Sequence, residues 1–324
     1  MQQEIRFATF NVCNLAPAGA RLYDNLLPST VAEVEAKLDW TAQQIDRLDA
    51  DVIGFQEIFS QASLREVLAR TRHYRDAIHV GFDPDPGADK YTPSVALVSR
   101  LPLAGPGSAF PYFPDGVEMP PGSRDPKRFS RPVVHAAIAV SPDVTVDVLV
   151  VHLKSKRPDY RNGDSSDDPL LYAQASLRSL IRRGTEAVAL RVLLSKLARA
   201  SKRARVVLGD FNDVADAVTT NIVLGTGTPL AERLFDTYQL QRRQDHLRHV
   251  GFSQLHEGQY STIDHILVSE EFNAALPNAI GEVLDVVYLN DHLVLELPEA
   301  SDHGQVLARV RLFDEMHGLS DAGM

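Results

Sequence analysis

Two short apolar runs that end in acidic residues constrain this chain more than any other feature of its sequence. Residues 206–212 read VVLGDFN, and residues 51–57 read DVIGFQE. Each pattern predicts a buried strand whose last residues emerge at the edge of a sheet. Because side chains alternate along a strand, we expect Asp210 and Asn212 on the same side. An Asx turn accounts for residues 206–212 as well as a water or metal site does, but the repeated pattern favours a metal at Glu57 over a helix N-terminal acid.

Two further strands are predicted to end in polar side chains. The β-branched and aromatic residues 5–12 predict a strand with Asn11 at its end, where a lone Asn usually starts a turn. Residues 145–153 predict another strand, in which His152 and Lys154 share one face. A lone His at a strand end is more often packed or solvated than catalytic. A His beside a Lys, at the same edge as the acidic residues, favours contact with a phosphate.

Hydrophobic periodicity and turn residues predict the remaining elements. Residues 261–269 predict a strand that contains Asp264, which we interpret as holding a partner in place because an unpaired buried carboxylate is costly. Strands are also expected at 95–101 and 131–140, within 283–297, and at 306–313. Helices are expected at 31–48, 63–72 and 170–200, the last with Gly184 as a break near its middle. Loops are expected at 79–92, 102–129 and 155–169, with a loose tail at 316–324.

The composition excludes several classes of protein. A hydrophobic fraction of 44% over 324 residues is normal for a folded chain with a sizeable core. The formal net charge of −10 provides no global basic field, so a polyanionic substrate requires a local basic or metal-bearing cleft. The single cysteine, Cys13, excludes an intrachain disulfide. No apolar run approaches about 18 residues and the N-terminus lacks a signal pattern, so we expect no membrane segment and a cytoplasmic location, with secretion as the alternative if the sequence is trimmed.

Six short motifs, taken in order, resemble those of the endonuclease/exonuclease/phosphatase superfamily. This group includes deoxyribonuclease I, exonuclease III, neutral sphingomyelinases and inositol polyphosphate 5-phosphatases. The motifs are FNV with Asn11, GFQE with Glu57, VHLKSK with His152, GDFND with Asp210 and Asn212, IDHILVS with Asp264, and SDHGQV with Asp302 and His303. Each motif alone is a weak signal, but the chance of all six occurring in order over about 300 residues is small. The sequences of these motifs are most similar to those of bacterial nucleases in the group.

The resemblance implies a fold and a metal site. The implied fold is α/β (α+β), a four-layer α/β/β/α sandwich of two mixed β-sheets as in deoxyribonuclease I, with the site at one end. The resemblance covers residues 5–313 of a single domain, residues 1–324. It implies Glu57 as a ligand of Mg²⁺ with Asn11 nearby, and Asp302 as a further metal contact. Mg²⁺ prefers oxygen ligands, and Mn²⁺ or Ca²⁺ are the alternatives.

The resemblance also implies catalytic roles at five positions. Asp210 activates the attacking water, and Asn212 orients the water or the phosphate. His152 and His303 donate hydrogen bonds to phosphate oxygens. Asp264 binds the far nitrogen of His303, which fixes its tautomer and raises its pKa. Whether a carboxylate or an imidazole is the general base stays open.

Other candidates near the motifs rank lower. The pair Asp291–His292 also reads as Asp-His, but SDHG at 301–304 is preferred because a final strand follows it. His265 is left out because it should face away from its neighbour Asp264. Arg131 and Lys154 are the candidate substrate-binding residues, although for Arg131 a structural role in the sheet ranks first.

The sequence therefore predicts a metal-dependent phosphodiester hydrolase. The first hypothesis is an endo- or exonuclease that acts on nucleic acid by in-line attack of water. The second is a phosphatase or phospholipase C-type enzyme that acts on a small phosphoester or a lipid headgroup. The third is an inactive binding scaffold, against which the retention of every catalytic residue type argues. No stable protein partner is implied.

Overall fold

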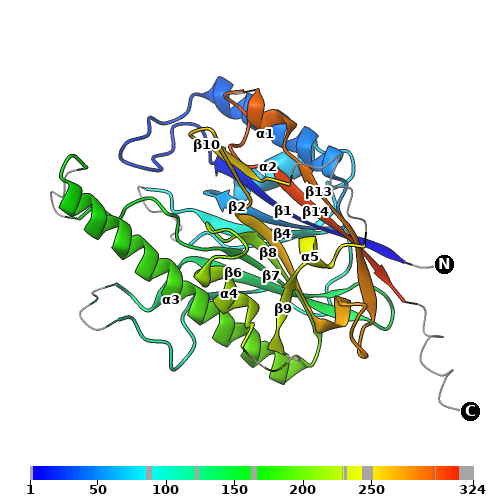
Figure 1. The fold of residues 1–324 in the computed structure, drawn as a ribbon. Helices are drawn as coiled ribbons and strands as arrows, with labels where there is room; N and C mark the ends of the chain where they lie inside the picture. Colours follow the sequence, from blue (N-terminus) through cyan, green and yellow to red (C-terminus); the bar gives the residue numbers. More distant parts are fainter. Residues whose placement is uncertain are drawn as a thin grey trace, which may run out of the picture.

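Two six-stranded sheets pack face to face, and helices cover both outer faces (Figure 1). The computed structural model describes residues 3–84, 90–120, 123, 125–161, 166–227, 229, 232–242, 251–295 and 297–313. The arrangement confirms the four-layer α/β/β/α sandwich of mixed sheets that the sequence resemblance implied. The predicted tail at 316–324 lies outside the described residues.

The first sheet has the strand order β13-β14-β1-β2-β4-β3. Its strands are β13 (Gly281–Leu289), β14 (Gln305–Leu312), β1 (Glu4–Leu15), β2 (Val52–Ile58), β4 (Ser94–Ser99) and β3 (Ile78–Gly81). β1 and β2 are parallel, and the other neighbours are antiparallel. The parallel pair therefore occupies the centre of this sheet.

The second sheet repeats this plan. Its order is β5-β6-β7-β8-β12-β9, with β5 (Ser108–Tyr112), β6 (Arg128–Ala139), β7 (Thr145–His152), β8 (Ala204–Asp210), β12 (Asp264–Ser269) and β9 (Leu234–Asp236). β7 and β8 are parallel, and the other neighbours are antiparallel. A separate hairpin pairs β10 (Gln254–His256) with β11 (Gln259–Ser261).

The helices form the two outer layers. α1 (Val31–Leu48) and α2 (Gln61–Arg70) cover the first sheet, and α3 (Pro169–Ser201) and α4 (Val218–Leu224) cover the second. The short elements are α5 (Thr237–Leu240) and the 3₁₀ turns η2 (Glu270–Phe272) and η3 (Asp291–Val294). α1 begins with a capping box between Thr30 and Glu33, and Asp168 caps α3. None of the helices in the described part of the chain has the length and hydropathy of a membrane span.

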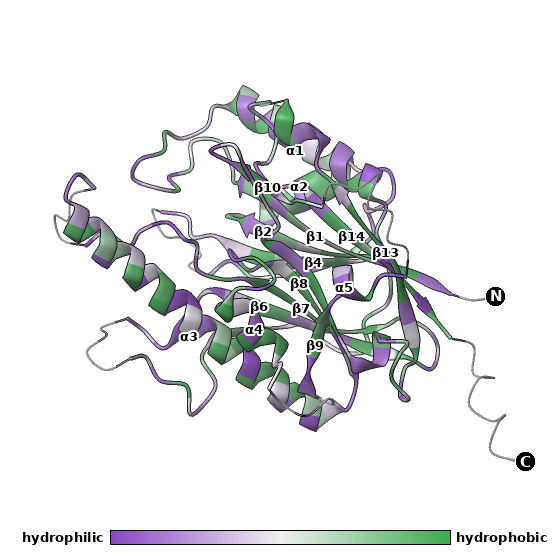
Figure 2. Ribbon diagram, viewed as in Figure 1, coloured by the Kyte–Doolittle hydropathy of each residue, from purple (hydrophilic) through white to green (hydrophobic). Residues whose placement is uncertain are grey.

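The central core lies between the two sheets, where the strands are predominantly hydrophobic (Figure 2). The sheets approach each other closely at Gly54 of β2. A Cβ atom built at Gly54 would lie 2.8 Å from the Cβ atom of Leu208 and 3.1 Å from a methyl group of Val150. Close packing of this kind leaves no space for an added methyl group. Gly54 therefore sets the separation of the sheets beneath the edge where β1, β2, β7 and β8 end.

The structure corrects three expectations about secondary structure. α3 continues through Gly184, because the apolar face that α3 buries on the second sheet offsets the roughly 1 kcal/mol cost of one helical glycine. β3 overlaps the start of the predicted loop 79–92, and β5 lies within the predicted loop 102–129. Both are short edge strands. β5 contains Pro111, a residue that sheets admit mainly at their edges. The predicted helices at 31–48, 63–72 and 170–200 are otherwise confirmed within two residues at each end.

Candidate active site

The polar strand ends meet at one edge of the sandwich. β1 and β2 end there in the first sheet, and β7 and β8 end there in the second. β12 and β14 run antiparallel to their neighbours and so begin at this edge. In the second sheet His152 is in register with Asp210, and Asp210 is in register with Asp264. Strand pairing alone therefore brings three of the predicted residues side by side.

Asp210 lies at the centre of this group and is fully buried. Its Oδ1 atom accepts a hydrogen bond of 2.7 Å from the backbone N–H of Asn212. Its Oδ2 atom accepts one of 3.1 Å from Nδ2 of Asn11 on β1. The same oxygen lies 3.3 Å from Nε2 of His152 and 3.9 Å from Nε2 of His303. Asp210 therefore connects the two sheets.

Burial and neighbouring charges separate the pKa values of the three central groups. Burial, and then the nearby Asp264 carboxylate, raises the pKa of Asp210 to about 7. Burial also opposes the charged form of His303, but the charge and hydrogen bond of Asp264 outweigh it and hold the pKa of His303 well above its ordinary value. Burial, and then the charge of Arg131, lowers the pKa of His152 well below its ordinary value. At neutral pH, His303 is therefore a cation and His152 is uncharged.

Asp264 and His303 form a buried ion pair. Oδ2 of Asp264 lies 2.8 Å from Nδ1 of His303, so the other ring nitrogen, Nε2, faces Asp210. The hydroxyl oxygen of Ser253 accepts the backbone N–H of Asp264 at 3.1 Å. Oδ1 of Asp264 is buried and has no hydrogen-bond partner among the described residues. The interpretation of Asp264 as holding a partner therefore matches the geometry.

The backbone of His303 is fixed by groups that sequence reasoning missed. The Ser301 hydroxyl oxygen accepts the N–H of His303 at 3.0 Å and donates to the backbone oxygen of Asn11 at 2.6 Å. His292 donates from Nε2 to the backbone oxygen of His303 at 2.9 Å. Ser301 opens the SDHGQV motif, which was its only sequence signal. His292 belongs to the lower-ranked Asp-His pair, and its hydrogen bond to the backbone oxygen of His303 stabilises the preferred pair.

Glu57 lies beside a strained turn at the end of β1. Cys13, Asn14 and Glu57 have positive φ angles of 55°, 57° and 60°. Such angles are unusual for residues other than glycine and tend to occur at functional sites. The backbone N–H of Asn14 donates to Oε2 of Glu57 at 3.0 Å. Burial, and then the Asp302 carboxylate, raises the pKa of Cys13, so the thiol stays protonated. The charges of Glu57 and Asp302 both act on this thiol, which places the two carboxylates in the same neighbourhood.

The residues at this turn fit a hard divalent cation. The available donors are the carboxylates of Glu57 and Asp302 and the Oδ1 atom of Asn14, which is buried without a hydrogen-bond partner among the described residues. An all-oxygen set of this kind suits Mg²⁺, which also keeps several waters. Asn14 carried no signal in the sequence beyond its place after the FNV motif.

A second group of possible metal ligands lies at the ion pair. Asp210, Asp264 and His303 each offer one ligand atom, and these atoms all lie within 4.8 Å of one another. An imidazole ligand suits transition metals more than Mg²⁺. The hydrogen bond from Nδ1 of His303 to Asp264 orients the ring as in carboxylate–histidine–metal arrangements. The residues of the first group therefore fit a divalent cation as they stand, whereas the second group binds one only when His303 has lost its proton.

Cationic side chains line the opposite side of the site. Nδ1 of His152 and Nε of Arg131 are buried without hydrogen-bond partners among the described residues. Nζ of Lys154 donates to the backbone oxygens of Ser155 and Arg157 at 3.2 and 3.1 Å. Burial, and then the charge of Arg131, lowers the pKa of Lys154 to about 8. Neither Arg131 nor Lys154 forms an ion pair within the described part of the chain, although the charges of Asp159 and Glu186 act on Lys154.

Asn212 and His265 lie outside the centre. β8 ends at Asp210, and Asn212 adopts a φ angle of 52° and donates from Nδ2 to the backbone oxygen of Leu153 at 3.0 Å. The alternation of a strand therefore does not extend to Asn212, so the expectation that its side chain shares a side with Asp210 loses its basis. His265 faces away from the centre, as expected, and its ring nitrogens contact Asp236 and the backbone oxygen of Asp213 at 3.0 Å each.

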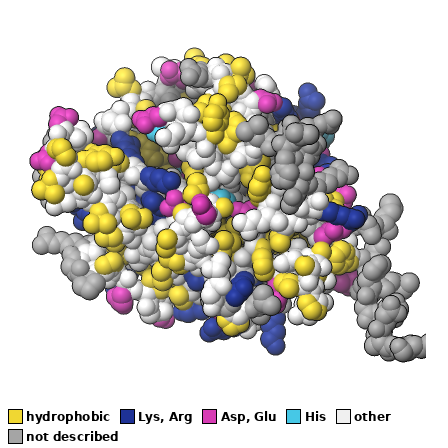
Figure 3. All heavy atoms as spheres, in the orientation of Figure 1, with side chains coloured by type: hydrophobic (Ala, Val, Ile, Leu, Met, Phe, Trp, Pro, Cys, Tyr) yellow, Lys and Arg dark blue, Asp and Glu magenta, His cyan; other side chains and the backbone are white. Residues whose placement is uncertain are grey.

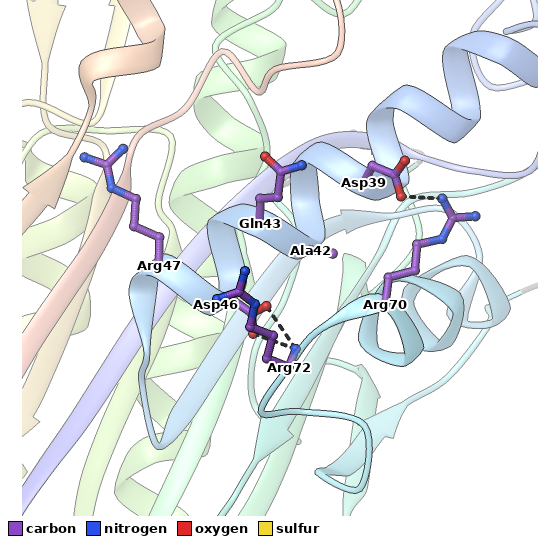
Figure 4. A pocket seen from close by; sticks show the side chains of 7 residues that line it. All are labelled: Asp39, Ala42, Gln43, Asp46, Arg47, Arg70 and Arg72. Carbon is purple, nitrogen blue, oxygen red and sulfur yellow. Dashed lines mark hydrogen bonds and ion pairs between the residues drawn. The ribbon is translucent and has the colours of Figure 1, made fainter.

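The pocket drawn in Figure 4 lies elsewhere, against the outer helices α1 and α2. Its lining residues are Asp39, Ala42, Gln43, Asp46, Arg47, Arg70 and Arg72. Arg70 pairs with Asp39, and Asp46 accepts the backbone N–H of Arg72. Its charges are therefore largely satisfied by the chain itself, and no predicted site residue lines it.

Comparison with known families places these residues in context. The profile of the Endonuclease/Exonuclease/phosphatase family matches residues 8–303. This range contains Asn11 and ends at His303, so it includes the named site residues of all six motifs. No curated protein sequence matches the chain.

Solved structures with the same fold cover almost the whole chain. An endonuclease/exonuclease/phosphatase family protein from Leptotrichia buccalis C-1013-b is 17% identical, with a TM-score of 0.57, over 96% of this chain and 100% of that one. The human Nocturnin catalytic domain with bound sulfate anion is 14% identical, with a TM-score of 0.61, over 96% and 98%. A mannosyl-6-phosphatase from Bacteroides thetaiotaomicron VPI-5482 is 16% identical, with a TM-score of 0.55, over 94% and 99%. At these identities the likeness establishes the fold.

Proposed function

This chain belongs to the endonuclease/exonuclease/phosphatase family, and we propose that it is an Mg²⁺-dependent phosphodiesterase that hydrolyses nucleic acid by in-line attack of water. The family consists of phosphoester hydrolases that depend on divalent metals. The observation that carries the proposal is the buried group of Asp210, Asp264 and His303. The pKa of Asp210 is raised to about 7. The hydrogen bond and charge of Asp264 hold the His303 imidazole in its cationic form.

Asp210 is the proposed general base. A base works best when its pKa lies near the operating pH, and the pKa of Asp210 is raised to about 7. The N–H of Asn212 and the carboxamide of Asn11 hold both oxygens of the carboxylate in place. Asp210 therefore accepts a proton from a water that lies between it and the phosphorus atom, in line with the leaving oxygen.

His303 and His152 are the proposed donors to the phosphoryl oxygens. The Asp264 carboxylate fixes the Nδ1 proton of His303, which leaves Nε2–H directed into the site. A cationic donor aimed at developing negative charge stabilises the transition state more than the ground state. His152 is the second proposed donor, through Nδ1, which has no partner among the described residues. The negative charge of a bound phosphate favours its imidazolium form, in which both ring nitrogens carry a proton. Removal of either donor is expected to lower kcat.

Glu57, Asn14 and Asp302 are the proposed residues that hold Mg²⁺. The bound cation would neutralise phosphoryl charge and stabilise the leaving oxygen. The strained turn at Cys13 and Asn14 presents these oxygens at the end of β1, next to Asn11. Asn11 thus lies between the metal ligands and the proposed base, which keeps the two at a fixed separation.

A nucleic acid substrate is supported by Arg131 and Lys154. Neither forms an ion pair within the described part of the chain, and both lie on the His152 side of the site, because the charge of Arg131 lowers the pKa of both His152 and Lys154. A substrate with a second phosphate beside the scissile one would neutralise these cations. A small phosphomonoester would leave them uncompensated.

The test is a substrate panel measured with Mg²⁺ and with EDTA. We expect cleavage of a fluorescent oligonucleotide and of bis(p-nitrophenyl) phosphate with Mg²⁺, and no cleavage with EDTA. Asp210→Asn and His303→Ala should each reduce the rate by about 10²–10⁴-fold, with unchanged circular dichroism. His256→Ala, at an exposed histidine in β10, is the matched control.

Two results would contradict different parts of the proposal. Hydrolysis of p-nitrophenyl phosphate with an intact oligonucleotide would refute the nucleic acid assignment and favour a phosphatase, the activity named for the Bacteroides protein of similar fold. Full activity in Asp210→Asn would refute the catalytic assignment itself.

A further inference from the structure

Three charged side chains of α3 are buried against the strands that carry the proposed substrate-binding residues. Arg182, Arg183 and Glu186 are 9%, 4% and 0% exposed. They lie on the buried face of a helix whose other contacts with the second sheet are mainly apolar. Buried charges cost stability unless they are well hydrogen-bonded, and apolar residues of similar volume often pack as well or better. These three side chains therefore indicate a role other than packing.

Glu186 connects the two strands from which Arg131 and Lys154 extend. Its Oε1 atom accepts the backbone N–H and the hydroxyl group of Ser130, at 2.8 and 2.6 Å. Its Oε2 atom accepts the backbone N–H of Lys154 at 2.8 Å. Nε of Arg182 donates to Oε1 at 3.1 Å and balances the charge of the carboxylate. Ser130 directly precedes Arg131 on β6, and Lys154 follows the end of β7. One fully buried carboxylate thus fixes the backbone at both proposed substrate-binding residues.

The two arginines bind backbone oxygens of the same two segments. Nη1 of Arg182 donates to the backbone oxygen of Pro126 at 2.8 Å, and its Nη2 donates to that of Arg128. Nη1 of Arg183 donates to the backbone oxygen of Lys154 at 3.3 Å. β7 ends at His152, so the peptide groups beyond it need partners from outside the strand ladder. Side chains of α3 supply them for both the N–H and the C=O of Lys154.

The contacts with α3 fix the backbone at Arg131 and Lys154 and leave their charged groups available. Nζ of Lys154 donates to oxygens of Ser155 and Arg157 at 3.1 to 3.3 Å and forms no ion pair among the described residues. Figure 3 shows Lys and Arg side chains between the N-terminal half of α3 and the middle of this face, where acidic and His side chains are visible. A cation on a fixed backbone loses less conformational freedom on binding a phosphate than one on a mobile loop does.

We propose that Glu186 is a positioning residue for substrate binding that acts through Arg131 and Lys154. The inference rests on the proposed function, in which these two cations contact a phosphate beside the scissile one. Glu186 is fully buried, so it does not touch the substrate itself. It holds the backbone from which both cations extend and so reduces the entropy lost when they bind. Contact with a second phosphate is the same in the ground state and the transition state, so the contribution of Glu186 falls on KM and not on kcat.

Glu186→Gln tests the proposal, because the amide has the same shape as the carboxylate but only one acceptor oxygen. The variant can no longer accept N–H groups from both strands. We expect KM for a fluorescent oligonucleotide to rise about five- to tenfold, with kcat within about twofold of the wild-type value. The value of kcat/KM for bis(p-nitrophenyl) phosphate should stay the same, because this diester has no second phosphate.

A double-mutant cycle separates positioning from a general loss of structure. In a chain that also carries Arg131→Met and Lys154→Met, Glu186→Gln should have no further effect on kcat/KM for the oligonucleotide, because the groups through which it acts are absent. An effect that persists in this background would overturn the proposal. So would an equal loss of kcat/KM for bis(p-nitrophenyl) phosphate.

Asp147→Asn is the matched control. Asp147 is a buried carboxylate of β7, and it accepts the hydroxyl group of Ser201, the last residue of α3, at 2.6 Å. It precedes His152 by five residues, which is about 17 Å along a strand. Asp147→Asn should lower the midpoint of urea unfolding, as Glu186→Gln does, and leave KM unchanged.

A second variant decides the question should Glu186→Gln fail to fold. Ser130→Ala removes only the hydroxyl donor to Glu186, at a partly exposed position. It should raise KM for the oligonucleotide about twofold, and an unchanged KM would overturn the proposal.

Failure of this inference is distinct from failure of the proposed function. A wild type that neither binds nor cleaves the oligonucleotide refutes the nucleic acid substrate, and this inference with it. A wild type that cleaves the oligonucleotide, with the same KM in Glu186→Gln, refutes this inference alone.

Discussion

Replacement of Asp210 by Asn should abolish hydrolysis and, at alkaline pH, make the folded protein more stable. Asp210 is fully buried, and burial together with the Asp264 carboxylate raises its pKa from 3.8 to about 7. Above pH 7 the folded chain must therefore hold an ionised carboxylate in an unfavourable position. Asn is nearly the same size and carries no charge, so it removes this cost.

The sign and size of the effect follow from proton linkage. The pKa of Asp210 is higher in the folded state, so the folded chain binds the extra proton between pH 3.8 and about 7. The associated stability is present below pH 3.8 and is lost as pH rises through 7. A pKa difference of about 3 corresponds to about 4 kcal/mol. The variant loses the hydrogen bond from Asn11 and the polar contact with Nε2 of His152 at 3.3 Å, each worth about 1 kcal/mol. We therefore expect a net gain of about 2 kcal/mol in the unfolding free energy at pH 9.

Urea unfolding at pH 5 and pH 9, followed by circular dichroism in EDTA, measures this gain. EDTA is needed because a bound cation would stabilise the ionised carboxylate and reduce the effect. The advantage of Asp210→Asn over the wild type should be near zero at pH 5 and about 2 kcal/mol at pH 9. Asp216→Asn, at an exposed carboxylate in the same loop, should show no such pH dependence. An advantage that is equal at both pH values would refute the assignment of a raised pKa to Asp210.

Three further predictions address the metal, the substrate and the sheets. Glu57→Gln should weaken Mn²⁺ binding at least about tenfold by calorimetry, with Glu66→Gln as the control at an exposed acid. Arg131→Met should raise KM for an oligonucleotide about tenfold with little change in kcat, because it removes uniform binding; an unchanged KM would return Arg131 to a structural role. Gly54→Ala should lower the unfolding free energy by about 1–3 kcal/mol, because the added methyl group meets Leu208, whereas Gly105→Ala has open space and should be neutral.

Strand ends were predictable from the sequence because they combine two local signals. The runs before Glu57 and Asp210 are apolar and short, and each changes abruptly to polar residues at the sheet edge. The order of six motifs then implied the sandwich, which the structure confirms. The boundaries of α1 followed from its hydrophobic periodicity. β3 and β5 were missed because edge strands pair on one side only, and their short sequences carry turn residues.

The supporting groups of the site could not be predicted, because their role depends on long-range contacts. Ser253 is buried and accepts the N–H of Asp264, yet it lies in a stretch without a motif. Asn14 and Glu57 approach each other only because β1 and β2 are parallel neighbours with a shifted register after Asn11. The alternation of side chains along a strand could not be applied to Asn212, because β8 ends two residues earlier, at Asp210. Local patterns identify the residues that strands carry, whereas a turn that follows a strand depends on the neighbouring strand.

The unsatisfied polar atoms of the site divide by chemical type and thereby orient the substrate. Among the proposed site residues, the buried oxygens without hydrogen-bond partners in the described chain are Oδ1 of Asn14 and Oδ1 of Asp264, and the nitrogens are Nδ1 of His152 and Nε of Arg131. Each buried group of this kind costs about 1–3 kcal/mol while it is unpaired. A scaffold that only bound a partner would be more stable with apolar residues at these positions.

A phosphoester with its cation satisfies Oδ1 of Asn14 and both nitrogens at once. The cation takes the Asn14 oxygen at the end of β1, and the phosphoryl oxygens take the nitrogens of Arg131 on β6 and His152 on β7. The water that Asp210 activates then lies between the cation and the nitrogens that bind the phosphoryl oxygens. The leaving group should then depart on the side of β1 and β2, because that is where the cation can stabilise its charge.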